Sequence, residues 1–345
     1  MMNRKIRDYG ISIGTMPTGS NNSITDVKGV KVGHTTLDEG KIKTGVTAIL
    51  PHEDNIFKEK LVAASHVING FGKSTGIIQI EEMGTVETPI ILTNTLSVGI
   101  AYETLIKYML RQNKDIGDTT GTINPIICEC NDGRINDIRG LHIKPEHIVE
   151  AIEKCNIDFD EGNVGAGTGM MCYGLKGGIG SSSRIIEFDG IKYTVGVLVL
   201  SNFGSLEDFV LNGNPIGQRL FKEIQDINTI EDKGSIILIV ATDIPLESRQ
   251  LKRIIKRVYP GISRTGSYTG NGSGEVVIGF STANRIKHYE RNDIIDIKII
   301  NENKIDKIFK ATVEATEEAI LNSLICSSST VDRRGKIVYS LKDLL

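Results

Sequence analysis

An unbroken apolar run, Ile236–Ala241, sets the first limit on the fold. Six consecutive apolar residues rich in Ile predict a strand that is buried on both of its faces. Such a strand lies inside a sheet that other layers of structure cover, so the run predicts a layered protein. Gly234 precedes the run, and Ser235 is the first position of the predicted strand.

Strand-like and helix-like segments alternate along the rest of the chain, which predicts an α/β protein in which helices cover sheets. Val- and Ile-rich runs bounded by turn-forming residues predict strands at 45–50, 89–93, 123–128, 193–200, 236–241 and 275–280. Apolar residues at helical spacing predict helices at 57–68, 98–110, 145–154, 215–225, 246–258 and 307–324. No internal repeat or long linker divides the 345 residues, so we expect a single domain, 1–345.

Composition places the chain among globular proteins and argues against several partner classes. It has 39% hydrophobic and 24% charged residues, and its net charge of −3 does not predict a nucleic-acid partner. Its one basic cluster, at 249–257, is expected to be the polar face of a helix. No segment has the length and apolarity of a membrane span or of a signal peptide core. Five cysteines without a CxxC pair predict reduced thiols, and we therefore expect a cytoplasmic protein.

Familiar cofactor and catalytic motifs do not fit this sequence. In Gly165–Gly169 the third glycine comes one position too early for a dinucleotide fingerprint, and Gly72–Ser74 lacks the leading glycine of a P-loop. The six histidines form neither HExxH nor HxH. The sequence therefore predicts no metal and no organic cofactor.

Gly234 and Ser235 indicate a different chemistry. A glycine leaves its carbonyl unshielded, so the hydroxyl of the serine that follows can attack it. If the bond between the two residues is cut, Ser235 becomes an N-terminal residue. Its α-amino group, with an ordinary pKa of roughly 7.7 to 8.0, can then act as a base toward its own hydroxyl. A simple turn before a strand is the alternative interpretation.

Nine segments, in order along the chain, resemble the DmpA-type aminopeptidases, which comprise the L-aminopeptidase/D-esterase-amidases and the β-peptidyl aminopeptidases. These segments are Asn22–His34, Glu87–Gly99, Asn163–Met170, Lys176–Gly180, Ser201–Gly204, Gly234–Ser235, Ala241–Asp243, Arg264–Ser267 and Phe280–Asn284. Because they span nearly the whole chain, their joint agreement is far more specific than any one of them.

The resemblance implies a four-layer αββα sandwich like that of the N-terminal-nucleophile hydrolases, but with different connectivity. It also implies a precursor that cuts itself between Gly234 and Ser235 into chains of residues 1–234 and 235–345, which stay together. By the same analogy we expect a homo-oligomer, a tetramer of processed units. Its substrates would be small peptides, amino-acid amides or esters.

The resemblance also assigns roles to four catalytic residues. Ser235 is implied to be the nucleophile, and Ser273 and Glu275 to orient it and move protons. Two residues apart, Ser273 and Glu275 would share one face of an extended strand. Asn202 is implied to donate its side-chain amide to the oxyanion.

An aminopeptidase must also recognise a free ammonium group, which is buried at low cost only opposite a carboxylate. Glu129 and Asp132, which flank Asn131 at the end of a predicted strand, are the candidates. A plain turn at the strand end is the other interpretation of these residues. Arg134 stands where relatives are expected to have an aromatic residue, so we expect weaker discrimination for cationic N-termini.

Two alternative functions remain open from the sequence. The first is acyl transfer to an amine, as in the self-cleaving ornithine acetyltransferases, although those enzymes use threonine where this chain has Ser235. The second is a binding or regulatory protein of the same fold that no longer processes itself.

Overall fold

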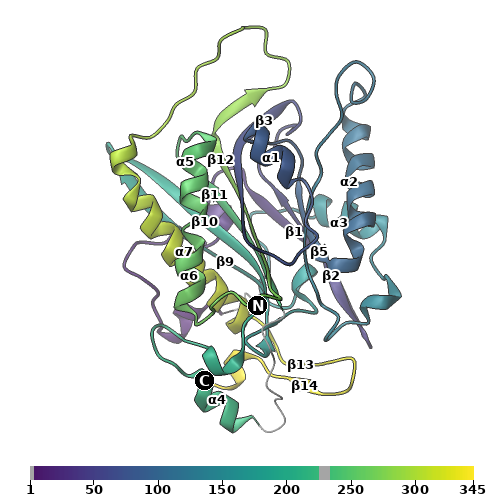
Figure 1. The fold of residues 1–345 in the computed structure, drawn as a ribbon, viewed down its shortest axis with the longest axis vertical. Coiled ribbons are helices and arrows are strands. Elements are labelled where there is room, and N and C mark those ends of the chain that lie inside the picture. Colours follow the sequence, from purple (N-terminus) through teal and green to yellow (C-terminus); the bar gives the residue numbers. More distant parts are fainter. Residues whose placement is uncertain (1–3, 225–233) are drawn as a thin grey trace.

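The computed structural model describes residues 4–224 and 234–345, and two mixed β-sheets face each other within them (Figure 1). The four-stranded sheet has the order β1 (Lys31–Glu39), β2 (Ile42–Leu50), β5 (Ile90–Asn94), β6 (Ile126–Cys130). The six-stranded sheet has the order β4 (Thr85–Val86), β3 (Glu59–Gly70), β12 (Gly274–Lys287), β11 (Ser235–Thr242), β10 (Ile191–Asn202), β9 (Gly178–Phe188). Strand β11 therefore lies in the middle of the larger sheet, parallel to β12 and antiparallel to β10.

Helices cover the outer face of each sheet (Figure 1). Helices α2 (Val98–Gln112) and α3 (Pro145–Glu153) pack on the four-stranded sheet. Helices α5 (Ser248–Ile255) and α7 (Asp306–Ile325) cover the six-stranded sheet, and α6 (Val258–Arg264) packs against α7. The order helices, sheet, sheet, helices confirms the expected αββα sandwich.

Short elements connect these layers. They are α1 (Ile77–Met83), α4 (Gly217–Glu223), the hairpin of β7 (Met171–Cys172) and β8 (Leu175–Lys176), and the hairpin of β13 (Thr330–Val331) and β14 (Ile337–Val338). No helix in the described ranges is long and apolar enough to cross a membrane.

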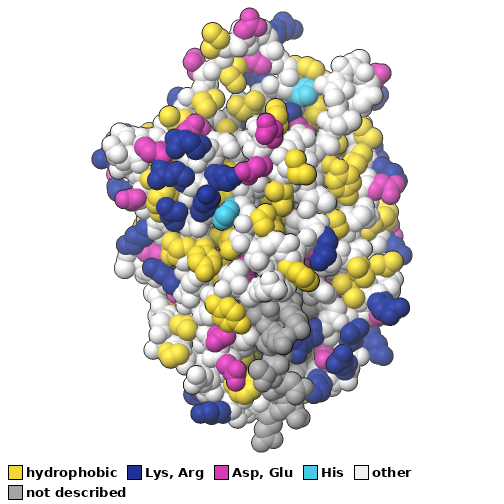
Figure 2. Space-filling model, in the orientation of Figure 1, with side chains coloured by type: hydrophobic (Ala, Val, Ile, Leu, Met, Phe, Trp, Pro, Cys, Tyr) yellow, Lys and Arg dark blue, Asp and Glu magenta, His cyan; other side chains and the backbone are white. Residues whose placement is uncertain are grey.

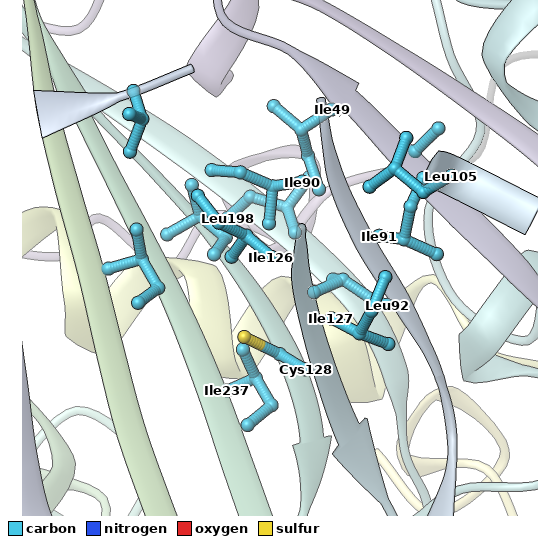
Figure 3. Close-up of a cluster of buried hydrophobic side chains, with 14 of the residues drawn as sticks. Ile49, Ile90, Ile91, Leu92, Leu105, Ile126, Ile127, Cys128, Leu198 and Ile237 are labelled. Carbon is cyan, nitrogen blue, oxygen red and sulfur yellow. The ribbon is translucent and has the colours of Figure 1, made fainter. Parts of the chain in front are cut away.

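Strand β11 contributes to two hydrophobic cores, one on each of its faces. Ile237, Ile239 and Ala241 pack between the two sheets, where Figure 3 shows Ile237 close to Cys128. Ile236, Leu238 and Val240 pack instead beneath the helices of the other face. All six side chains are at most 1% exposed, which confirms a strand buried on both faces.

Most of the predicted elements are confirmed, but the helix predicted at 57–68 is wrong. This segment is mainly the long strand β3, which pairs with β12 and β4. Residues 61–65 are buried in succession, so strand partners on both edges and cover on both faces outweigh the helical spacing of its apolar residues. The helix predicted at 246–258 is two helices, α5 and α6. Residue 225, the last of the helix predicted at 215–225, lies outside the described residues.

The basic segment at 249–257 is the polar face of α5 and of the turn after it, as predicted. Leu251 and Ile254 are fully buried, whereas Arg249 is exposed and forms an ion pair with Glu302 at 3.0 Å. Figure 2 shows the Lys and Arg side chains gathered over this part of the surface, with acidic side chains beside them.

Candidate active site

Three neighbouring strand ends meet at Ser235. In the β10–β11 ladder Ser235 lies directly opposite Asn202, and in the β11–β12 ladder it lies directly opposite Gly274. Side chains alternate between the faces of a strand, and Ile237, two positions beyond Ser235, packs between the sheets. Ser235 and Asn202 therefore share the face that looks toward the four-stranded sheet.

The peptide bond between Gly234 and Ser235 is held from two sides. Ser235 Oγ donates a hydrogen bond to the Gly234 carbonyl oxygen at 2.8 Å, and the Gly274 backbone N–H donates to the same oxygen at 3.1 Å. A Cβ atom at Gly234 would lie 1.9 Å from the Asn202 carbonyl oxygen, so only glycine fits this close approach. The hydroxyl and the preceding carbonyl are thus side by side.

Both ends of the Asn202 side-chain amide make hydrogen bonds. Its Oδ1 accepts from the Met171 backbone N–H at 2.9 Å, and its Nδ2 donates to the Asn131 carbonyl oxygen at 3.1 Å. The second contact joins the six-stranded sheet to the loop after β6. Among residues 4–224 and 234–345, one of the two Nδ2 hydrogens has no acceptor and is left for a group that enters the site.

Ser273 and Glu275 lie on either side of Gly274, and both are fully buried. Strand β12 begins at Gly274, so Ser273 is the last residue of the preceding turn rather than part of the strand. Asn69 holds this turn, because its Nδ2 donates to the carbonyl oxygens of Gly270 and Ser273. Ser273 Oγ has no hydrogen-bond partner within the described residues, which leaves this hydroxyl available to a group that enters the site.

Glu129 is a buried carboxylate close to the same strand ends, with 3% of its surface exposed. Its Oε1 accepts from the Lys73 backbone N–H at 2.8 Å, and its Oε2 accepts from Thr95 Oγ1. A Cβ placed on Gly72 would be 3.5 Å from Glu129 Oε1 and 4.0 Å from the Gly274 Cα. Glu129 and the β12 end beside Ser235 therefore both lie close to Gly72.

Asp132 and Arg134 have different surroundings. Asp132 is fully buried and accepts from Asn136 Nδ2 at 3.1 Å, and burial raises the pKa of its carboxyl group to about 6. Arg134 is exposed, and the nearby charges that act on its guanidinium are those of Asp332 and Arg334, between β13 and β14. Of the three predicted substrate-binding residues, Glu129 is the one that the structure places beside Gly72 and Gly274.

Other chemistries find less support around these strand ends. Cys128 lies close to Ile237 in the core (Figure 3), but burial raises the pKa of its thiol to about 12, which disfavours a thiolate. Within residues 4–224 and 234–345, no group of three or more His, Cys, Asp or Glu side chains could hold a metal ion. The arrangement favours an oxygen nucleophile aided by amide and carboxylate groups.

Several residues that shape the site were missed from the sequence: Asn69, Gly72, Thr95 and Met171. Their contribution is made by backbone groups or by contacts across long sequence separations, such as Asn69 on β3 with the turn before β12. Thr95 lies inside the segment Glu87–Gly99 that carries the resemblance, and this was the only signal for it.

Comparisons with known proteins cover almost the whole chain. The model of peptidase family S58 matches residues 22–338. The beta-peptidyl aminopeptidase BapA of Sphingosinicella microcystinivorans is 36% identical over an alignment of 359 residues, which covers 98% of this chain and 89% of that protein.

Solved structures match with similar coverage. A protein of Pyrococcus horikoshii OT3 has a TM-score of 0.94 and 53% identity, covering 99% of this chain and 97% of its own. The L-aminopeptidase D-Ala-esterase/amidase of Ochrobactrum anthropi has a TM-score of 0.90 and 35% identity, covering 98% of this chain and 95% of its own. That enzyme is described as a prototype of the serine aminopeptidases and as a new variant of the Ntn hydrolase fold.

Proposed function

The chain belongs to peptidase family S58, and we propose that it is a serine aminopeptidase that first cuts its own backbone between Gly234 and Ser235. The family match bears out the resemblance to the DmpA-type aminopeptidases. The observation that carries the proposal is the contact of Ser235 Oγ with the Gly234 carbonyl oxygen at the junction of three strand ends.

Self-cleavage would proceed by an acyl shift from nitrogen to oxygen. Ser235 Oγ bonds to the Gly234 carbonyl carbon, the carbon–nitrogen bond breaks, and the hydroxyl proton passes to the leaving nitrogen. The Gly274 N–H already donates to this carbonyl oxygen at 3.1 Å, so it can stabilise the negative charge that develops there. Water then hydrolyses the ester, which frees the Ser235 hydroxyl and leaves a carboxylate on Gly234.

The new N-terminus would then serve substrate hydrolysis. The Ser235 α-amino group takes the hydroxyl proton while Oγ attacks the substrate carbonyl, and the acyl-enzyme that forms is hydrolysed by water. Asn202, directly opposite Ser235, offers its remaining Nδ2 hydrogen to the oxyanion. Ser273 and Glu275, beside Gly274, complete the proton path.

Substrate recognition would rest on Glu129. Within the part of the chain that the structure describes, its buried carboxylate receives two hydrogen bonds, both from neutral donors, the Lys73 backbone N–H and Thr95 Oγ1. An entering ammonium group can therefore be its charged partner. Asp132 is the weaker candidate because its carboxyl group, with a pKa raised to about 6, is tied to Asn136. Arg134 lies exposed after β6, and its positive charge is expected to weaken the discrimination for cationic N-termini.

The deciding experiment compares the wild type with Ser235→Ala by intact mass and by hydrolysis of a panel of amino-acid p-nitroanilides. We expect two fragments and activity for the wild type, and a whole, inactive chain for Ser235→Ala. The matched control is Ser20→Ala, at an exposed serine whose Oγ contacts Asp26, and it should be cut and active. A serine-directed acylating reagent should label the 235–345 fragment, and EDTA should leave the activity unchanged.

Each alternative gives a different result. An uncut, inactive wild type would indicate a binding or regulatory protein of the same fold. A cut protein that transfers the acyl group to an added amine faster than to water would indicate an acyltransferase. Cleavage of Ser235→Ala would point to an outside protease.

A further inference from the structure

Lys176, at the end of β8, is a fully buried cation whose hydrogen-bond partners are backbone carbonyls. Its Nζ donates to the carbonyl oxygens of Gly167 at 2.9 Å, Met170 at 2.8 Å and Gly177 at 2.6 Å. An ammonium group has three donors, and all three are used here. No carboxylate of the described residues forms an ion pair with it, and a buried ammonium group without such a pair is strongly disfavoured, so its position calls for an explanation.

One peptide group connects this cation to the candidate oxyanion donor. The Met170 carbonyl oxygen accepts from Lys176 Nζ and also from the Gly177 N–H at 3.0 Å. The N–H of the same peptide group, on Met171, donates to Asn202 Oδ1 at 2.9 Å. A continuous hydrogen-bonded path therefore runs from the Lys176 ammonium group through the Met170–Met171 peptide group to the side-chain amide of Asn202. The path ends at Asn202 Nδ2, on the residue opposite Ser235.

We propose that Lys176 is a positioning residue that orients and polarises the Asn202 amide through the Met170–Met171 peptide group. This inference rests on the proposed function, which gives Asn202 its role. A cation on the carbonyl oxygen draws electrons through the peptide, so its N–H becomes a stronger donor to Asn202 Oδ1. The same polarisation makes Nδ2 a stronger donor to the oxyanion, while the fixed peptide prevents the amide from turning over.

The charge state of Lys176 links this path to pH. Burial lowers the pKa of its ammonium group to about 7. The charged and titratable groups around it are Asp38, Asp132 and Cys172, which raise this pKa, and Lys43, which lowers it. Above pH 7 the group loses a proton, and a neutral amine has only two hydrogens for three carbonyl oxygens. The polarisation of Asn202 should therefore weaken as pH rises through about 7.

The test is a double-mutant cycle of Lys176→Met and Asn202→Ala, with kcat and KM measured per processed molecule. In the wild-type background Lys176→Met should lower kcat about 10-fold and leave KM unchanged. This loss is smaller than the loss expected when a whole oxyanion donor is removed, because Asn202 itself is still present. In the Asn202→Ala background Lys176→Met should have no further effect on kcat. Lys107→Met, which removes an exposed cation that pairs with Glu103 on α2, is the control and should leave kcat unchanged.

Two results would overturn the proposal: an unchanged kcat for Lys176→Met, or an equal loss in both backgrounds. If Asn202→Ala itself left kcat unchanged, the proposed role of Asn202 would fail instead, which is a distinct outcome. If Lys176→Met does not fold, the pH profiles of the wild type and of Asn202→Ala decide. Deprotonation of the Ser235 α-amino base raises kcat in both proteins, so the ratio of wild-type kcat to Asn202→Ala kcat is compared, and this ratio should fall as pH rises through about 7. A ratio that stays constant between pH 6 and pH 8 would refute the proposal.

Discussion

Ser235 and Asn202 lie directly opposite each other in the antiparallel β10–β11 ladder, where β11 begins and β10 ends. Opposite residues of such a pair have Cα atoms roughly 4.5 to 5.5 Å apart, and the sheet fixes this spacing. The proposed nucleophile and oxyanion donor are therefore held by the central ladder of the six-stranded sheet and not by two loops. Sites built on strands keep their geometry more closely than sites built on loops.

The first prediction concerns the close approach at Gly234. In Gly234→Ala the new methyl group would lie 1.9 Å from the Asn202 carbonyl oxygen, so the strand ends must move apart. We expect self-cleavage to slow by at least about 10-fold, because misplacement of reacting atoms by even 1 Å is costly. The rate is followed as the loss of the intact chain with time.

A matched control for this substitution is Gly99→Ala in α2. A Cβ at Gly99 would meet no atom within 4 Å, and alanine favours the helix. This variant should be cut at the wild-type rate. Equal cleavage of Gly234→Ala would mean that the close packing at Gly234 has no part in processing.

The second prediction concerns the free amino group of the substrate. Wild-type protein should hydrolyse an amino-acid anilide and leave its N-acetylated form almost untouched. Glu129→Gln removes the buried negative charge but keeps one oxygen that can accept from the Lys73 N–H, while its NH2 group can donate to Thr95 Oγ1. We expect KM for the free-amine substrate to rise by at least about 10-fold, since a buried ammonium without its charged partner is strongly disfavoured. Steady-state kinetics with both substrates provide the measurement.

Arg134→Tyr complements this experiment at the exposed position after β6. Removal of its positive charge should increase the preference for substrates whose N-terminal residue is cationic. If the wild type cleaves the acetylated substrate equally fast, the ammonium site does not exist. If Glu129→Gln leaves both KM and kcat unchanged, the recognising carboxylate lies elsewhere.

The third prediction uses the titration of Asp132. Its carboxyl group has a pKa raised to about 6 by burial, above the ordinary value of 3.8, so between these values the folded state binds more protons than the unfolded state. Its contribution to stability therefore falls as pH rises from about 4 to 6. The side chain of Asp132→Asn does not titrate. Between about pH 4 and pH 6 the free energy of unfolding of this variant should therefore rise by on the order of 2 kcal/mol relative to that of the wild type. Urea unfolding at pH 4 and pH 7 measures the difference, and a constant difference would contradict the assignment.

The sequence predicted β11 because a run of six buried apolar residues has few alternatives, but it did not predict β9. The segment Gly178–Phe188 begins with glycines and serines, which are typical of loops. These small residues are needed because α7 crosses the strand closely: a Cβ at Gly180 would lie 2.0 Å from the Ala319 carbonyl oxygen. Ser182 Oγ also donates to the Ala315 carbonyl oxygen at 2.7 Å. Packing between segments that are distant in the sequence leaves no local sequence pattern from which β9 could be predicted.

Some residues of the candidate site could likewise be predicted from the sequence, and others could not. Ser235 was proposed from its place at the start of the predicted buried strand as well as from the resemblance, whereas Asn202 and Glu275 were proposed from the resemblance alone. The contact of Asn69 with the turn before Ser273 was not foreseeable, because it requires β3 and β12 to be neighbours. The segment that forms β3 was predicted as a helix, so its pairing with β12 was also missed.

The last prediction concerns how the two expected chains stay together after cleavage. Arg184 on β9 is fully buried and pairs with two glutamates of α7, Glu314 at 3.2 Å and Glu318 at 2.7 Å. Arg7 also pairs with Glu318 at 2.7 Å. Burial acts to raise the pKa of Glu318, but the two arginines hold it below its ordinary value. These contacts join the expected chain 1–234 to the expected chain 235–345.

Arg184→Met would leave both glutamates without their buried partner, which typically costs about 3–5 kcal/mol. We expect the processed variant to unfold at a lower urea concentration and its fragments to separate earlier on size exclusion. Arg219→Met, which removes an exposed partner of Glu223 on α4, should change stability by less than about 0.5 kcal/mol. Glu318 has a lowered pKa in the folded protein, so it stabilises the folded state only while its carboxyl group is ionised. Acid that protonates this group should therefore also separate the wild-type fragments. If Arg184→Met is as resistant to urea as Arg219→Met, the shared sheet alone holds the two chains together.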